Sequence, residues 1–287
     1  MSEENEKSSY QPLRSTSNTV KYLVIVNVLI FILQYIMQSY WNIDIAEWFA
    51  LYNFKSDKFM LYQLVSHMFL HAGFTHLFFN MLVLWMFGSA LEQVWSPRKF
   101  LYYYFFTGIG AALLHLGINM YTNNQLEQDI KAYKSAPELV TFKELIDGEI
   151  GLNNLKENQD NSFLKKIDGF ISVWQKDPNN EQYIQSSVRI AGIYEQIVID
   201  RPSVGASGAI FGILLAFGML FPNALIYVYF LFPIKAKYFV VIMGLIELYM
   251  GLSTQNSNVA NFAHVGGMLF GFILMKIWGD KSYKKIN

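Results

Sequence analysis

The sequence contains no cysteine, which excludes disulfide bonds and thiolate metal sites and leaves the redox compartment open. Charged residues are also scarce, because they make up 15% of the 287 residues, whereas a soluble domain has about a quarter. The formal net charge is zero, which argues against nucleic acid as a partner. Hydrophobic residues make up 53% and aromatic residues 17%. This balance indicates a protein in contact with the lipid bilayer.

The hydrophobic residues are gathered into runs that predict membrane spans. A spanning helix needs roughly 20 predominantly apolar residues. The six candidate runs are about 22–40, 76–94, 99–120, 205–221, 238–253 and 261–278. The polar start of the chain lacks the layout of a signal peptide, so we expect the first run to be retained as a span. The run 224–233 is too short to cross and ends at Pro233, which predicts an interfacial connection.

The positions of lysine and arginine predict the orientation of these spans, because short cytoplasmic loops carry an excess of both. In a six-span arrangement the basic residues that flank the spans all fall on one side: Lys7, Arg14, Lys21, Arg98, Lys99, Lys235, Lys237, Lys276, Lys281, Lys284 and Lys285. The short connection 254–260 on the other side has no charge. We therefore expect both termini on the cytoplasmic side.

One long polar segment separates the third run from the fourth. Residues 121–203 contain nine Lys or Arg and thirteen Asp or Glu. Apolar residues at helical spacing predict a helix over 181–199, which Pro202 ends. Two further stretches, 125–147 and 163–176, are amphipathic. We expect Pro137 to interrupt the first and Gly169 to interrupt the second. We predict a helical insertion outside the membrane, on the extra-cytoplasmic side.

Polar side chains inside the predicted spans are functional candidates, because they are costly in lipid. In the second span His76 and Asn80 are four residues apart and share one helix face. Ser207 stands among glycines where the fourth span begins, and His264 stands in the sixth. Glu247 in the fifth span faces water near these residues or pairs with a group that the sequence does not identify.

The fourth and sixth spans each have a pair of glycines that leaves one helix face without side chains at those positions. Gly208 and Gly212 are four residues apart, and so are Gly267 and Gly271. Small residues at this spacing let two membrane helices approach closely. We therefore expect backbone contact between these two spans.

Such contact would bring the Ser207 hydroxyl within reach of the His264 imidazole, which is what a general base needs to activate a nucleophile. Acyl transfer also needs donors for an oxyanion. The side chains of His76 and Asn80 and the backbone N–H of Ser207 could supply them, each worth about 3 kcal/mol of the barrier. Taken alone, the glycine-rich setting of Ser207 also fits plain helix packing.

Three motifs, HxxxHxxxxHxxxN, GxSG and AHxxGxxxG, occur in this order and together resemble the rhomboid intramembrane serine proteases. The resemblance covers the predicted bundle and leaves out the insertion. It implies that Ser207 is the nucleophile and His264 the base of a dyad without a third carboxylate. It assigns His76 and Asn80 to the oxyanion. The supporting residues implied by the resemblance are Gly88, Glu92, Gly205, Gly208, Phe211, Gly267 and Gly271.

The chain departs from the family pattern in two places. Where the family often has a Trp-Arg pair before the first histidine, this sequence has Tyr62 and Gln63, so an arginine contact with lipid or loop is missing. The segment 121–203 replaces a connection that is short in the family. It would lie beside the mouth of the site, where it could gate or select substrates.

The histidines also raise a metal site. His67, His71 and His76 lie within ten residues, but no carboxylate or cysteine accompanies them and the HExxH pattern is absent. We therefore expect no metal and no cofactor. A structural hydrogen-bonding role is expected for His67, a structural or water-retaining role for His71, and hydrogen bonding within the bundle for His115.

The sequence thus predicts an all-α polytopic membrane protein, with a six-helix rhomboid-like transmembrane bundle and a largely helical insertion between helices 3 and 4. The expected segments are a cytoplasmic tail over 1–20, spans one to three over 21–120, the insertion over 121–203, spans four to six over 204–278 and a second cytoplasmic tail over 279–287.

The expected function is that of an intramembrane serine endopeptidase that cleaves single-span membrane proteins. The alternative is a catalytically silent rhomboid-like scaffold that binds membrane helices. A transporter would predict inverted repeats, which the sequence does not contain. The expected location is a bacterial inner membrane, and the oligomeric state is left open.

Overall fold

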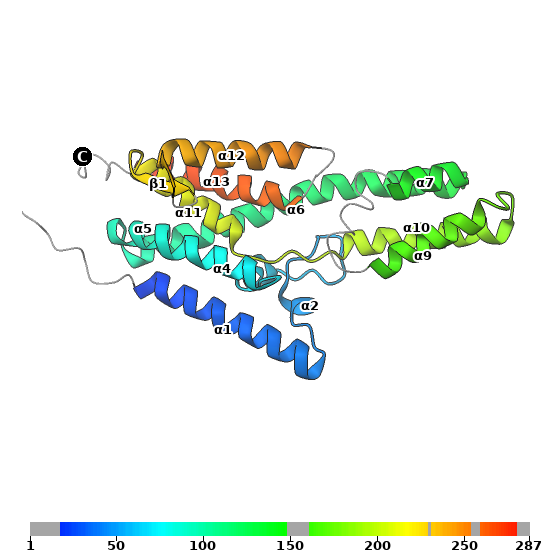
Figure 1. Ribbon diagram of the computed structural model, residues 1–287, viewed down its shortest axis with the longest axis horizontal. Helices are drawn as coiled ribbons and strands as arrows, with labels where there is room; N and C mark the ends of the chain where they lie inside the picture. Colours follow the sequence, from blue (N-terminus) through cyan, green and yellow to red (C-terminus); the bar gives the residue numbers. More distant parts are fainter. Residues whose placement is uncertain (1–17, 148–160, 229–230, 254–258, 280–287) are drawn as a thin grey trace, which may run out of the picture.

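The computed structural model describes residues 18–147, 161–228, 231–253 and 259–279. This part of the chain is elongated and mostly helical, with a bundle at one end and a smaller group of helices at the other (Figure 1). The bundle consists of α1 (Asn18–Trp41), α4 (Phe74–Val83), α5 (Ser89–Val94), α6 (Pro97–Ser135), α11 (Ser207–Leu220), α12 (Ala236–Leu252) and α13 (Val259–Trp278).

The six apolar runs that the sequence predicts as spans all lie in helices. Four helical segments are long and apolar enough to cross a membrane, namely Asn18–Trp41, Phe74–Val94, Pro97–Ser135 and Ala260–Trp278. The second of these joins α4 to α5 through one π-helical turn, η2 (Leu84–Gly88). The apolar helices α11 and α12 are shorter, with 14 and 17 residues. Among the described residues, four helical segments therefore have the length of a span, where the sequence predicts six spans.

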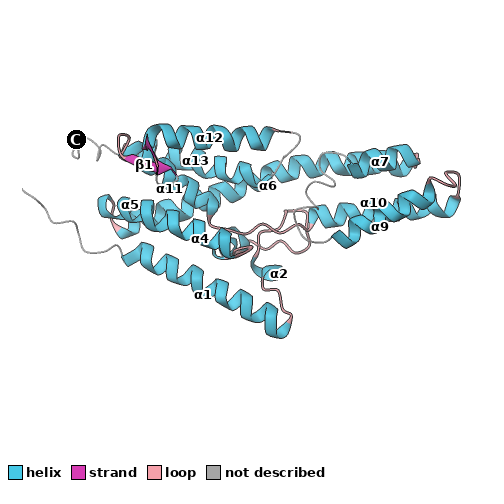
Figure 2. Ribbon diagram, in the orientation of Figure 1, coloured by secondary structure: helices cyan, strands magenta, loops and turns pink. Residues whose placement is uncertain are grey.

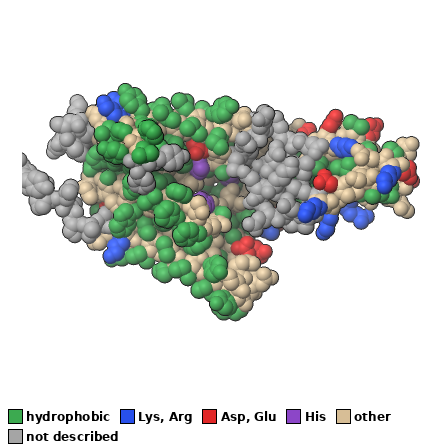
Figure 3. All heavy atoms as spheres, viewed as in Figure 1, with side chains coloured by type: hydrophobic (Ala, Val, Ile, Leu, Met, Phe, Trp, Pro, Cys, Tyr) green, Lys and Arg blue, Asp and Glu red, His purple; other side chains and the backbone are tan. Residues whose placement is uncertain are grey.

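The centre of the bundle is formed by α6, α11 and α13 (Figure 1). The Tyr103 hydroxyl on α6 donates to the Gly212 carbonyl on α11 at 2.9 Å. Large apolar side chains such as Leu29 on α1 and Leu245 on α12 point outward and are exposed. Figure 3 shows hydrophobic side chains spread over this end and charged ones gathered at the other. An apolar exterior around a hydrogen-bonded interior is the arrangement that lipid favours.

Glu92, the acid of the second predicted span, connects α5 to the start of α1. Its two carboxylate oxygens accept from the backbone N–H groups of Thr19, at 3.1 Å, and Val20, at 3.0 Å. These are N–H groups of the first helical turn, which have no partner within the helix. Glu92 therefore caps α1, as a carboxylate at a helix N-terminus is expected to do.

The helix α6 does not stop at residue 120, where the apolar run ends, but continues to Ser135. No strong helix breaker lies before Pro137, so the backbone hydrogen bonds run on into the insertion. There α6 packs with α7 (Leu139–Asp147), α9 (Asn161–Trp174) and α10 (Glu181–Ile199). Their shared core is apolar and separate from that of the bundle: Leu126, Ile130, Tyr133, Phe142, Ile146, Ile167, Trp174, Ala191 and Tyr194.

The helices of the insertion follow the sequence prediction with one exception. The helix α10 has the predicted bounds and begins after Asn180, whose side chain accepts from the Gln182 backbone N–H at 3.0 Å. Gly169 does not interrupt α9 as expected. A glycine costs a helix only about 1 kcal/mol, and the burial of Ile167 and Trp174 on either side offsets that cost.

A two-stranded antiparallel hairpin lies between α11 and α12. Its strands are β1 (Leu225–Val228) and β2 (Phe232–Lys235), which pair from Leu225 opposite Lys235 to Val228 opposite Phe232. Figure 2 shows it at the end of the bundle away from the insertion. The stretch predicted as an interfacial connection is thus an ordered hairpin, and residues 229–230 within it lie outside the described part.

The connection between α1 and α4 is organised by one buried side chain. Its short helices are α2 (Ala46–Phe49), α3 (Gln63–Ser66) and the 3-10 turn η1 (His67–Phe69). The fully buried Gln63 donates from Nε2 to the carbonyls of Trp48, at 3.0 Å, and Lys58, at 2.9 Å. Its Oε1 accepts from the Met60 N–H at 3.1 Å. The side-chain amide of Gln63 therefore makes the contacts within this loop, at the position where the family often has an arginine.

Candidate functional site

Ser207 is the first residue of α11, and the segment before it is fixed at two points. Leu51 and Ser203 exchange two backbone hydrogen bonds of 2.9 Å. The N–H of Gly205 donates to the His67 carbonyl, also at 2.9 Å. Gly205 has φ of 126°, which only glycine adopts without strain. The chain thereby turns into α11 with Ser207 in its first turn, where the backbone N–H groups have no partner within the helix.

The helices α11 and α13 touch backbone to backbone through their glycine faces. A Cβ on Gly267 would collide with the carbonyl oxygen of Gly208. A Cβ on Gly271 would lie 3.4 Å from the Cα of Gly212. The contact predicted from the glycine spacing is therefore present, and it sets the separation of the two helices.

This contact brings Ser207 and His264 together. The Ser207 Oγ lies 2.9 Å from His264 Nε2. Phe211, one turn further along α11, stacks on the imidazole with ring centroids 4.2 Å apart and planes 9° from parallel. The imidazole is therefore held by a hydrogen bond at one edge and by an aromatic ring on one face.

The second ring nitrogen of His264 meets a carboxylate. Glu247 Oε2, on α12, lies 2.9 Å from His264 Nδ1 and also accepts from Asn261 Nδ2 at 2.7 Å. An ionised carboxylate only accepts hydrogen bonds, so Nδ1 carries the proton and Nε2 is left to accept from the Ser207 hydroxyl. The acid for which the sequence identified no partner therefore pairs with His264, at the ring nitrogen that does not face Ser207.

Both His76 and Asn80 lie on α4, and the His76 side chain extends to the segment before Ser207. A Cβ on Gly205 would lie 2.7 Å from His76 Cε1, so the His76 ring lies directly against this backbone. Asn80 is buried, and its Nδ2 has no hydrogen-bond partner among the described residues. A buried donor without a partner is unfavourable and suggests a position that a further acceptor can fill.

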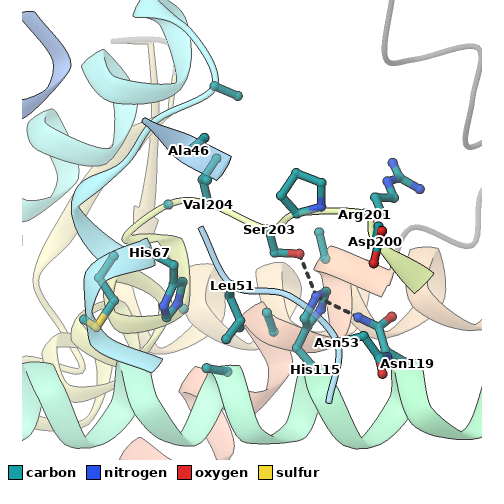
Figure 4. Close-up of a pocket in the computed structure, with 18 of the residues that line it drawn as sticks. Ala46, Leu51, Asn53, His67, His115, Asn119, Asp200, Arg201, Ser203 and Val204 are labelled. Atoms are coloured by element: carbon teal, nitrogen blue, oxygen red, sulfur yellow. Dashed lines mark hydrogen bonds between the residues drawn. The ribbon is translucent and has the colours of Figure 1, made fainter. Parts of the chain in front are cut away.

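A cavity of about 940 Å³ extends from Ser207 toward the insertion. Small residues line it near the serine: Gly108, Ala111, Ala209 and Ala263. Farther out its wall is polar, and Figure 4 shows His115 between two partners. His115 Nε2 lies 2.8 Å from Ser203 Oγ and 3.0 Å from Asn119 Nδ2. The cavity thus has small side chains near Ser207 and a hydrogen-bonding outer part.

His67 and His71 also line this cavity. His67 Nδ1 is 2.7 Å from the Gln63 carbonyl, and burial lowers the pKa of His67 to about 4. Burial likewise lowers the pKa of His71 to about 4, and the His71 ring packs edge-on against His76 at 5.1 Å. Both imidazoles are therefore neutral at pH 7. Within the described ranges, no group of three or more His, Cys, Asp or Glu is placed to hold a metal ion.

These features define a multi-pass membrane protein whose helices enclose a Ser–His site next to a cavity. The sequence model of the Rhomboid domain matches residues 58–130 and 182–281, more than half of the chain. The chain belongs to the rhomboid family. The unmatched stretch 131–181 falls within the insertion, which agrees with the departure noted in the sequence.

A similar protein is the uncharacterised mitochondrial rhomboid protein of Schizosaccharomyces pombe. It is 23% identical over 295 residues, a match that covers 90% of this chain and 66% of that protein. The chain thus spans slightly less than two thirds of the length of this relative. The match extends across most of the chain and is not confined to the three motifs.

Glu247 and Asn261 are the residues at this site to which the sequence assigned no role. The signal available for Glu247 was a carboxylate within an apolar helix, which is costly unless it is paired. The identity of its partner depends on how α12 packs against α13, and the spacing of residues along one helix does not contain that information.

Proposed function

We propose that the chain is an intramembrane serine endopeptidase, with Ser207 as nucleophile and His264 as general base. The observation that carries the proposal is the 2.9 Å contact between Ser207 Oγ and His264 Nε2. It occurs among helices apolar enough to span a membrane. Membership of the rhomboid family, whose members are generally serine intramembrane proteases, supports the same reaction.

In the proposed reaction, Ser207 Oγ attacks the carbonyl carbon of the scissile peptide and its proton moves to His264 Nε2. The carbonyl oxygen becomes an oxyanion, which the Ser207 N–H and the side chains of Asn80 and His76 stabilise. Nε2 then gives its proton to the leaving nitrogen as the C–N bond breaks. Water attacks the resulting acyl-enzyme and passes a proton to Nε2, which returns it to Ser207 Oγ as the acid product leaves.

The proposed substrates are single-span membrane proteins. The backbone hydrogen bonds of a transmembrane helix are satisfied internally, so a scissile carbonyl becomes accessible only where the helix unwinds easily. Gly108, Ala111 and Ala209 line the inner cavity, and their small side chains support a small substrate residue before the scissile bond.

We propose six spans, with both chain ends on the cytoplasmic side of a bacterial inner membrane and the insertion on the opposite side. The bias of lysine and arginine in the connections supports this orientation. The S. pombe relative is mitochondrial by name, so the compartment is tested by fractionating cells that express a tagged chain. Protease added from the extra-cytoplasmic side should cut within the insertion and spare both ends.

The test of the activity is cleavage of a single-span reporter, whose helix contains a Gly-Pro break, by the purified protein in detergent. Wild type is compared with Ser207→Ala and His264→Ala, and with Ser172→Ala as a matched serine control on the exposed face of α9. Cleavage by wild type and Ser172→Ala, and none by the other two at equal thermal stability, supports the proposal.

Failure of wild type to cleave is resolved with a fluorophosphonate probe. Labelling that depends on Ser207 and His264 means that the nucleophile is competent and the reporter is unsuitable. A wild-type protein that is folded, does not cleave and is not labelled overturns the proposal. The chain would then act as the alternative, a rhomboid-like scaffold that binds membrane helices.

A further inference from the structure

Glu247 is a carboxylate in the middle of an apolar helix. On α12 its neighbours in sequence are Leu245, Ile246 and Leu248, and only 11% of its side chain is exposed. An ionised group in such surroundings is strongly unfavourable unless it is paired and hydrogen-bonded. Retaining it therefore requires specific partners.

Its two hydrogen-bond partners among the described residues lie on α13. His264 Nδ1, at 2.9 Å, and Asn261 Nδ2, at 2.7 Å, share the same oxygen, Oε2. Asn261 and His264 are three residues apart and so lie on one face of the helix. The carboxylate is thus fixed by the amide while it contacts the imidazole, an arrangement in which a third group orients a catalytic base.

We propose that Glu247 is a positioning residue for His264, so that the site works as a Ser–His–Glu triad. This inference rests on the proposed function. Glu247 keeps the proton of the resting imidazole on Nδ1, which leaves Nε2 free to take the Ser207 proton. When Nε2 is protonated, the carboxylate stabilises the imidazolium and takes no proton itself. Asn261 keeps Oε2 in place during both states.

A purely structural role would be to connect α12 to α13. The two helices have other contacts, however: a Cβ on Gly251 would lie 3.1 Å from the Phe262 ring, and one on Gly244 would lie 3.0 Å from Met268 Cε. The helices therefore pack closely on both sides of Glu247. Its replacement by an amide of the same shape should leave them in place.

The decisive variant is Glu247→Gln. Its amide can donate to Nδ1, which places the imidazole proton on Nε2 and blocks proton transfer from Ser207. In the serine-protease triad the equivalent acid-to-amide change lowers kcat about 10⁴-fold. We expect kcat for the reporter to fall between about 10² and 10⁴-fold, with KM changed less than about twofold and thermal stability retained. Glu247→Asp, which keeps the carboxylate, should recover part of the rate.

The ¹⁵N spectrum of the histidine rings gives a readout that a packing role would not change. In wild type Nδ1 of His264 should be the protonated nitrogen, and in Glu247→Gln the proton should move to Nε2. Asn261→Ala, which leaves the carboxylate on His264, should lose less than about tenfold in kcat. Glu195→Gln, a matched change in a partly exposed ion pair with Lys134, should have wild-type activity.

Two results overturn the inference while the proposed function stands. One is a cleaving wild type whose Glu247→Gln variant stays within threefold of it in kcat. The other is a loss in Glu247→Gln with the tautomer unchanged and an equal loss in Asn261→Ala. A wild type that neither cleaves nor reacts with the fluorophosphonate contradicts the proposed function instead, so the two failures are distinguishable.

Discussion

Gly205 and His76 are in direct contact, because a Cβ added to the glycine would lie 2.7 Å from Cε1 and 2.9 Å from Nε2 of the imidazole. The glycine also has φ of 126°, a conformation that other residues rarely adopt. Gly205→Ala should therefore lower the free energy of unfolding by about 1–3 kcal/mol. It should also slow fluorophosphonate labelling of Ser207, because the segment before the nucleophile must shift.

The matched control for this change is Gly117→Ala on α6, where nothing lies within 4 Å of the added Cβ. Alanine there should be neutral or stabilise the helix by up to about 1 kcal/mol. Equal labelling rates for Gly205→Ala and wild type would show that this contact does not position the serine.

Asn80 has the side chain most clearly available for an oxyanion, since its buried Nδ2 has no partner in the described part of the chain. Asn80→Ala should lower kcat by about 10²–10³-fold, the cost of losing one oxyanion donor. KM should change little, because the interaction forms only in the transition state. Reporter kinetics measure both constants. Asn124→Ala, at a partly exposed asparagine bonded to Lys55, should match wild type. Asn80→Ala would also match wild type if the Asn80 amide served only packing.

Gln63 should contribute to stability far more than an ordinary glutamine. Removing its amide leaves part-buried backbone groups of Trp48, Lys58 and Met60 without this partner, and an unsatisfied buried group costs about 1–3 kcal/mol. Gln63→Ala should therefore lower the free energy of unfolding by about 2–4 kcal/mol. The comparison is Gln38→Ala, whose exposed side chain bonds only to Asn42. A similar small effect for both variants in thermal unfolding would contradict this assignment.

His67 predicts that the protein loses stability in mild acid. Burial lowers its pKa from 6.5 to about 4, so between these values the unfolded chain binds a proton that the native protein does not. Stability is therefore fully present above about pH 6.5 and is lost as the pH falls toward 4, by up to about 3 kcal/mol.

The check is the unfolding midpoint measured between pH 7.5 and 4.5. His67→Gln should make the decline shallower without abolishing it, because the pKa of His71 is lowered to the same region. A decline equal to that of wild type would mean that His67 is protonated in the native protein.

The sequence predicted the elements whose limits are set by local chemistry. The helix α10 has the expected bounds because an N-cap precedes it and Pro202 follows it. The sequence divided α6 into a span over 99–120 and an amphipathic stretch that Pro137 interrupts, whereas the structure joins them in one helix that ends at Ser135. The hairpin β1–β2 was missed because each strand has only four residues, too few for a reliable alternation.

The contact of α11 with α13 could be predicted, because each helix has two glycines four residues apart. A pair of glycines at this spacing indicates a close approach, even when it is seen on one helix alone. The pairing of Glu247 with His264 could not, because it joins two helices with no such pattern between them. A single acid in an apolar helix indicates that a partner exists, and only the packing of α12 on α13 identifies it.

The length of α6 has a consequence for which proteins can reach Ser207. At 1.5 Å per residue its 39 residues extend about 58 Å, nearly twice the ~30 Å of hydrocarbon in a bilayer. In the proposed orientation, α6 would therefore hold the helices of the insertion outside the lipid headgroups. If the proposed function holds, we expect a substrate with a bulky folded domain close to its span to collide with these helices, and one with a long, thin juxtamembrane segment to reach Ser207.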